Sequence, residues 1–228
     1  MRPLRYPPVH GRSRMMRLSS YKITLLRVAA GKGIGAFCHL LFLSLRDALF
    51  EQKHIVFCLS GNAIDLCGRC HVEGVTFQRF HTWDEVGERI KADIAQAAKS
   101  VWWGSPDWFD RGWQLWVGKV EGSLGVLSWS RDDKHSSGFF CPVPPRSMVI
   151  WQTVTLPDFR GRHLYSAMLA HVVETKAREG FERFYISCRD YNMSSRAGIR
   201  RVGFERIGCA RVRKWSKLSI WVPERAPR

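Results

Sequence analysis

The segment from Val154 to Leu169 has the residue order of a strand, a short basic turn and a helix. The strand ends at Pro157, and the first turn of the helix after it carries unpaired backbone N–H groups and the positive end of a dipole. Arg160 and Arg162 add formal positive charge to the turn. These features predict an anion site that could hold a pyrophosphate group. An ordinary turn with solvated arginines is the alternative that the local chemistry leaves open.

A second segment, Asn192-Met-Ser-Ser195, opens another helix, which is followed by Gly203-Phe204. Pro-x-x-Arg-Gly-x-x-Leu-x-Ser-x-x-Leu from residue 157, then Asn-x-x-Ser and Gly-Phe, resembles the two signature motifs of the GNAT superfamily of acyl-CoA N-acyltransferases. The order of elements over residues 75–222 is similar as well, so the resemblance covers about two thirds of the chain. It implies an α+β (three-layer α/β) fold, with a mixed, mainly antiparallel sheet flanked by helices and splayed central strands.

The resemblance also implies where acetyl-CoA, or another acyl-CoA, would bind as co-substrate. The pantetheine arm would lie between strands 147–155 and 184–188, and a backbone N–H near Thr153 would polarise the acyl oxygen. By the same similarity, the cofactor-binding residues are Thr153, Val154 and Thr155 on the strand, Arg160, Gly161, Arg162, His163, Leu164, Tyr165 and Ser166 in the turn, and Asn192 with Ser195.

The sequence departs from the family pattern in ways that concern both cofactor binding and catalysis. His163 and Tyr165 stand where glycines are usual in the pyrophosphate loop, and Ile199 stands where many relatives carry a tyrosine as general acid. Strand 147–155 offers no Glu or Asp as general base. The phenol of Tyr191, next to Asn192, is the substitute candidate for the proton donor. The predicted catalytic residues are therefore Tyr191 and, through its backbone N–H, Thr153.

The hydrophobic periodicity predicts the elements that must position these residues. Strands are expected at 75–80, 113–120, 124–129, 147–155, 184–188, 204–211 and 215–222, with helices at 162–179 and 192–202. Another helix is expected to start at the capping box of Thr82 and Glu85. The predicted organisation is a basic flexible tail at 1–20, a helix and strand extension at 21–74 (helix 35–50, strand 54–59), the GNAT-like domain at 75–222 and a tail at 223–228.

The net charge of +16 lies at the two ends of the chain. Residues 1–50 carry 9 basic and 1 acidic side chains, residues 151–228 carry 16 and 7, and the middle is nearly neutral. This distribution favours an anionic partner. An acyl-CoA meets that requirement, a peripheral membrane association through the basic N-terminus stays open, and nucleic acid is the less favoured partner.

The seven cysteines are an odd number, scattered through apolar runs, which is typical of reduced thiols and predicts a cytoplasmic location. The longest apolar stretch, residues 34–45, is shorter than the roughly 20 residues that span a bilayer, so no transmembrane helix is expected. Cys67 and Cys70 have the spacing of a haem or zinc motif, but the sequence offers few further ligands and no clear export signal, so no metal is expected.

The predicted function is transfer of an acetyl or other acyl group from acyl-CoA to an amine of a small molecule, by direct transfer. An aminosugar is one candidate acceptor, although no residue identifies it. Two alternatives remain: a catalytically inactive acyl-CoA-binding protein of the same fold, and a basic module that binds nucleic acid or a membrane surface. The sequence does not indicate the oligomeric state.

Overall fold

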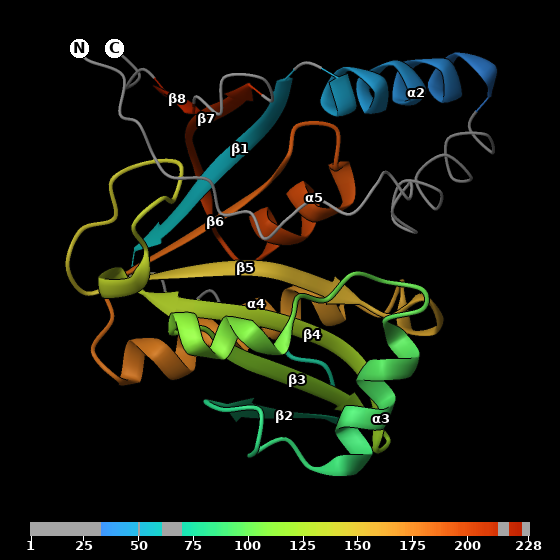
Figure 1. Ribbon diagram of the computed structural model, residues 1–228, viewed down its shortest axis with the longest axis vertical. Coiled ribbons are helices and arrows are strands. Elements are labelled where there is room, and N and C mark those ends of the chain that lie inside the picture. Colours follow the sequence, from blue (N-terminus) through green and yellow to red (C-terminus); the bar gives the residue numbers. More distant parts are fainter. Residues whose placement is uncertain (1–32, 50, 61–69, 214–218, 225–228) are drawn as a thin grey trace.

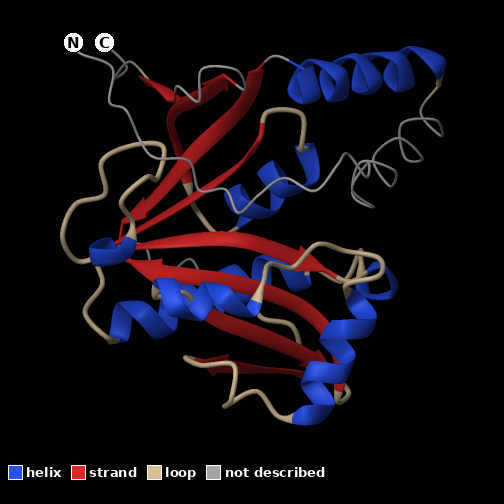
Figure 2. Ribbon diagram, viewed as in Figure 1, coloured by secondary structure: helices blue, strands red, loops and turns tan. Residues whose placement is uncertain are grey.

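A single eight-stranded sheet with helices on both faces forms the body of the molecule (Figures 1 and 2). This computed structural model describes residues 33–49, 51–60, 70–213 and 219–224. The strand order is β2-β3-β4-β5-β6-β1-β7-β8, and the β5–β6 pair is parallel while every other pair is antiparallel. The mixed, mainly antiparallel sheet predicted from the sequence is therefore confirmed.

The strands are β1 (Glu51–Ser60), β2 (Val75–Phe80), β3 (Gln114–Val120), β4 (Ser123–Asp132), β5 (Ser147–Thr155), β6 (Arg183–Arg189), β7 (Glu205–Arg213) and β8 (Ser219–Pro223). The helices are α2 (Ile34–Leu49), α3 (Glu88–Ala97), α4 (Leu164–Arg178) and α5 (Met193–Arg201), with short 3-10 turns η2 (Pro106–Arg111), η3 (Asp133–His135) and η4 (Pro157–Phe159). None of the helices that the structure describes is long and apolar enough to cross a membrane.

Two apolar clusters hold the helices against the sheet. On one face, α4 and α5 contribute Met168 and Ile199, which pack with strand residues such as Phe57. On the other face, Ile90 and Ile94 of α3 pack with the tryptophan-rich hairpin of β3 and β4. Burial on both faces is the main stabilising term for such a layered fold.

The strand β1 lies inside the sheet, between β6 and β7, although the sequence analysis assigned it to an extension outside the domain. Val56 faces the α3 side and Phe57 faces the α4 side, and neither side chain is exposed. A strand with two buried faces has apolar residues in succession, as β1 has, but this pattern does not say which strands flank it. At the other end, β8 runs to Pro223, one residue beyond the predicted domain.

The helix α3 begins at Glu88, later than the capping box predicted. One bond of a capping box is present, since Glu85 N donates to Thr82 Oγ1 at 3.3 Å, but the Glu85 carboxylate accepts at 2.7 Å from His81 N, one residue before Thr82. The two hydrogen bonds close a turn that precedes the helix, and Gly87 is the N-cap residue. The other predicted elements are found, two strands with the predicted bounds and the rest with ends shifted by a few residues; residues 1–20 and Cys67 lie outside the described part of the chain.

Candidate active site

The two central parallel strands separate part of the way along their length. Pairing between β5 and β6 runs from Ser147 with Arg183 to Ile150 with Ile186 and extends no further in the described structure. The strand β5 continues to Thr155, paired only with β4 on its other edge. Its buried residues give way to half-exposed ones at Trp151. We call this opening the fork; it confirms the splayed strands that the resemblance implied.

A β-bulge in β5 lies at the start of the fork. Leu127 of β4 pairs with Val154 and Trp129 pairs with Trp151, so two residues of β5 oppose one residue of β4. The first of the two, Gln152, has φ of 49°, in the left-handed region that is uncommon for a residue other than glycine. Its side-chain Nε2 donates to the carbonyl of Trp102 at 2.9 Å, which ties the bulge to the segment after α3. A bulge turns backbone groups out of the ladder beside the predicted residue Thr153.

Side chains at the fork include two hydroxyl groups without partners. Thr155 Oγ1 and Ser187 Oγ are buried, and neither has a hydrogen-bond partner in the described structure. Thr153 differs, because its hydroxyl shares a 2.7 Å hydrogen bond with Ser128 Oγ. Buried polar groups are nearly always hydrogen-bonded, so these two hydroxyls have hydrogen-bonding capacity that a ligand or water can use. Ser187 was not predicted; it lies outside both motifs.

The basic turn leads from the end of β5 to the start of α4. Gly161 and His163 both adopt left-handed backbone conformations, with φ of 81° and 59°. The first intrahelical bond of α4 runs from Ala167 N to His163 O, so the preceding amides at the N-terminus remain available to a ligand. Arg160 and Arg162 are exposed at the same turn. Turn amides, a helix N-terminus and two cations are a suitable combination for binding phosphate groups.

The helices α4 and α5 meet beside this turn. Ser166 Oγ donates to the carbonyl of Gly198 at 3.2 Å, and a Cβ on Gly198 would lie 2.6 Å from the Tyr165 ring. Only glycine allows so close an approach at this position. Burial raises the pKa of Tyr165 and the nearby Cys188 adds to the rise, whereas a hydrogen bond with Ser195 opposes it. The tyrosine that replaces a loop glycine is therefore a packing contact between the helices.

Asn192 and Ser195 bond to one another at the start of α5. The Asn192 Oδ1 atom accepts from the Ser195 N–H at 3.1 Å, and its Nδ2 donates to Ser195 Oγ at 2.6 Å. Asn192 is thus the N-cap of α5. Apart from the hydrogen bond between Ser195 and Tyr165, the side-chain contacts described for these two predicted residues are those of a helix cap.

Tyr191 lies next to a cluster of charges that joins α2 to the loop after β6. Asp47 is 2 % exposed and lies between Arg46, at 2.8 Å, and Arg189, at 3.6 Å. Arg46 also contacts Asp190 at 3.1 Å. Burial, followed by the charge of Asp47, raises the pKa of Tyr191 to about 12. The phenol therefore keeps its proton at neutral pH, as a proton donor must.

His54 of β1 is a titratable group near the fork that the sequence analysis did not single out. Its ring lies 4.3 Å from that of Phe140 and 6.5 Å from that of Trp151, between centroids. Its Nδ1 atom is buried and has no partner among the described residues. Burial, with Arg189 nearby, lowers its pKa well below 6.5, so the ring is neutral at pH 7 and resists protonation. The His54 ring lies near the fork because β1 lies inside the sheet, next to β6.

Ile199 and the cysteines take no part in a catalytic or metal-binding group of the described structure. Ile199, at the position where relatives often carry a tyrosine, is fully buried in the core. The described part of the chain contains no group of three or more His, Cys, Asp or Glu placed to hold a metal ion, and its six cysteines are unpaired. Cys70 is buried, and its thiol lies 3.7 Å from the carbonyl of Arg201.

Comparison with known proteins assigns the fold. The model of the acetyltransferase (GNAT) family matches residues 88–204, just over half of the chain. The chain therefore belongs to the GNAT acetyltransferase family, and acyl transfer is the general activity of that class. No curated protein matches the chain.

Solved structures of GNAT acetyltransferases have a similar fold at low sequence identity. An acetyltransferase of the GNAT family from Colwellia psychrerythraea is 13% identical with a TM-score of 0.50, covering 77% of this chain and 57% of that one. A GCN5-related N-acetyltransferase from Kribbella flavida is 11% identical, with a TM-score of 0.47 and coverage of 78% and 60%. This chain thus spans less than two thirds of the length of either protein.

Proposed function

We propose that this protein transfers an acetyl or other acyl group from acyl-CoA to an amine of a small molecule. The observation that carries the proposal is the fork: β5 leaves β6 after Ile150, bulges at Gln152 and leads directly into a basic turn at a helix N-terminus. This arrangement offers a strand edge, a polarising amide and a phosphate site along one path.

The pantetheine arm and the phosphates of acyl-CoA have matching groups on this path. The free edge of residues 151–155 offers backbone groups to the amides of the pantetheine arm, and the orphaned Thr155 and Ser187 hydroxyls offer further hydrogen bonds. The phosphates meet the turn amides together with Arg160 and Arg162. Asn192 and Ser195 cap the start of α5, which packs against the first turn of α4.

The proposed chemistry is direct transfer in a ternary complex. The acceptor nitrogen attacks the thioester carbonyl, so a C–N bond forms while the C–S bond breaks. A backbone N–H near Thr153 stabilises the negative charge on the carbonyl oxygen. The departing thiolate takes a proton from Tyr191, and the proton lost by the nitrogen goes to water. An aminosugar is one acceptor class to test.

Calorimetric titration of acetyl-CoA tests the binding half of the proposal. Replacing Arg160 and Arg162 by Glu should weaken binding at least about tenfold, because the phosphates then face two negative charges. The matched control replaces the exposed Lys99 and Arg183 by Glu, which changes the net charge by the same amount away from the turn. Equal weakening in both variants, or no binding to the wild type at about millimolar cofactor, would refute the site.

Release of free coenzyme A thiol, measured over a panel of primary amines that includes glucosamine, tests the catalytic half. Thiol release that depends on the amine supports acyl transfer. Tight binding of acetyl-CoA without thiol release from any amine favours the second candidate, an inactive acyl-CoA-binding protein. The observation behind that candidate is the buried Ile199, an aliphatic side chain that cannot donate a proton.

A further inference from the structure

The helix α2 carries an apolar stripe on its outer surface. Five of its large apolar side chains are exposed, between 37 % for Leu41 and 79 % for Ile34. They follow one another at helical spacing, so they lie along one side: Ile34, Leu41, Phe42, Leu45 and Leu49. We call these five residues the α2 stripe. The outer face of a surface helix normally carries charged and polar residues, so this helix is unusual.

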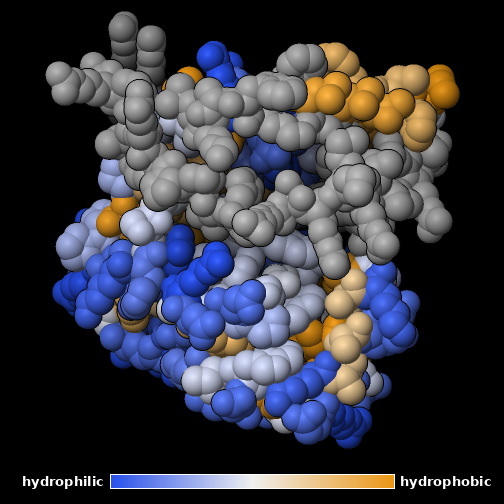
Figure 3. Space-filling model, in the orientation of Figure 1, coloured by the Kyte–Doolittle hydropathy of each residue, from blue (hydrophilic) through white to orange (hydrophobic). Residues whose placement is uncertain are grey.

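The structure leaves most of α2 projecting from the body. Figure 1 shows the helix extending away from the sheet, and Figure 3 shows its hydrophobic surface at the edge of the molecule. Its C-terminal end is fixed, because Arg46 contacts Asp190 and the buried Asp47 lies near Arg189. These ion pairs hold the helix in place on the catalytic domain. The stripe is thus a fixed surface, about 22 Å long at 1.5 Å per residue.

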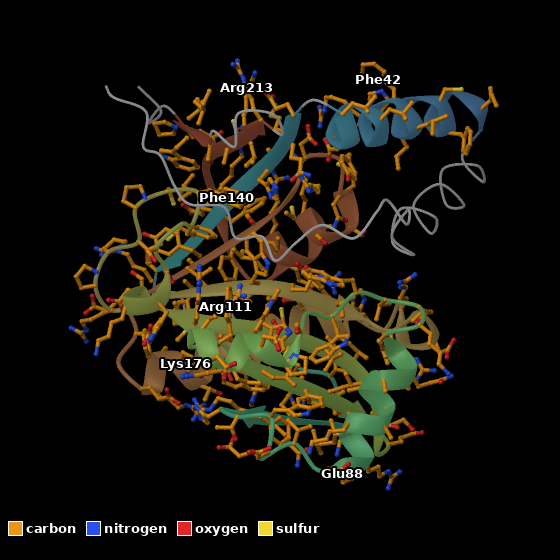
Figure 4. The ribbon with its side chains drawn as sticks, viewed as in Figure 1. Phe42, Glu88, Arg111, Phe140, Lys176 and Arg213 are labelled. Carbon is orange, nitrogen blue, oxygen red and sulfur yellow. The ribbon has the colours of Figure 1, made fainter. Side chains whose placement is uncertain are left out.

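A contiguous apolar surface of this kind marks a docking site. The charge of the residues near the stripe distinguishes between two occupants, a lipid surface and a second copy of this chain. The 33 residues that precede α2 include eight Lys or Arg and no Asp or Glu. Within the described structure, Arg213 is exposed and lies at the same end of the molecule as Phe42 (Figure 4).

Positive charge beside an apolar stripe matches an anionic lipid surface, since phospholipid head groups attract the cations and the acyl region takes up the apolar side chains. A second copy of this chain would bring two strongly basic segments together, which disfavours self-association. The helix has 16 residues, which is short of a membrane span but sufficient to lie along the interface.

We propose that the α2 stripe docks this protein on anionic membranes, to which the net positive charge of the chain also attracts it. The stripe enters the apolar boundary while the catalytic domain stays in water. This inference is independent of the proposed acyl transfer, because neither the fork nor the basic turn takes part in it.

Co-sedimentation with lipid vesicles tests the docking. Wild-type protein is mixed with vesicles of phosphatidylcholine alone and with vesicles in which about a third of the lipid is phosphatidylglycerol, at low and high salt. The double variant Phe42→Glu with Leu45→Glu should bind the anionic vesicles at least about tenfold more weakly than the wild type. The matched control is Met193→Glu, because Met193 is 64 % exposed and Phe42 is 65 % exposed. It should change binding less than about twofold.

Urea unfolding of all variants verifies that they are folded, which is expected because the substituted side chains are exposed. Binding that needs anionic lipid, weakens with salt and is lost in the α2 variant supports the proposal. Binding that is equal on both vesicle types, or undiminished in the variant, would overturn it. Light scattering tests the other occupant, a second copy of the chain. A wild-type protein that is dimeric and binds no vesicles, together with a monomeric α2 variant, would assign the stripe to a dimer interface and contradict the proposed membrane docking.

Discussion

The charge cluster around Asp47 makes a quantitative prediction about how firmly α2 is joined to the domain. Replacing Asp47 by Asn keeps the size of the side chain and removes its charge. Exposed ion pairs contribute about 0–1 kcal/mol, whereas removing one partner of a buried pair costs about 3–5 kcal/mol. Asp47 is 2 % exposed, but Arg46 and Arg189 are about a quarter exposed, so water will partly solvate them. We therefore expect a loss of about 2 kcal/mol, between the two limits.

Urea unfolding measures this loss, and a melting temperature lower by about 4–8 °C should accompany it for a chain of this size. The matched control is Glu88→Gln, because the exposed Glu88 pairs with Lys91 at 2.7 Å on the surface of α3. It should cost less than about 0.5 kcal/mol. Equal effects of the two substitutions would show that the cluster around Asp47 does not hold α2.

The Asp47→Asn variant should also change how the free energy of unfolding depends on pH above about pH 10. The pKa of Tyr191 is about 12 in the folded protein and about 10 in an unfolded chain. Between these values the folded state keeps a proton that the unfolded state has lost, so the free energy of unfolding falls as pH rises from about 10 to 12. The charge of Asp47 is one cause of the raised pKa, after burial, and its removal should make that fall shallower. An unchanged slope would contradict the assigned contact.

Three other outcomes are expected. Substituting His163→Gly, at a φ of 59°, should raise the stability by up to about 1 kcal/mol in urea unfolding, because glycine adopts this conformation without strain; a loss would contradict the strain argument. Tyr191→Phe should lower turnover by about 10²–10⁴-fold, keep acetyl-CoA affinity and remove a falling limb near pH 12; wild-type rates would exclude Tyr191 as the acid. A chain that starts at Met15 should keep the melting temperature of the full chain in a thermal scan, and a large decrease would show that the first residues pack.

Local patterns in the sequence were sufficient to predict most of the elements and the order of the catalytic half. The strands at Val75–Phe80 and Ser147–Thr155 were predicted with the bounds that the structure has, because each has a clear apolar pattern and a break at its ends. The turn after Pro157 could be located because helix N-termini have characteristic neighbours. Asn192 was identified by motif, and the structure shows it capping α5.

The sequence did not predict what depends on tertiary pairing. The position of β1 between β6 and β7 is determined by hydrogen bonds between residues more than a hundred positions apart, and no local pattern records them. His54 comes to the fork only through that pairing. The left-handed Gln152 was also missed, since glutamine gives no signal for a positive φ and the bulge arises from the register with β4.

Backbone amide NMR with acetyl-CoA tests the central claim most directly, because it identifies the residues that the ligand contacts without any knowledge of the acceptor. The account predicts that shifts concentrate at Thr153–Thr155 on the fork and at Gly161–Ser166 in the turn. Shifts confined to another part of the surface, such as the hollow between Asp133, Arg146 and Phe181, would contradict it.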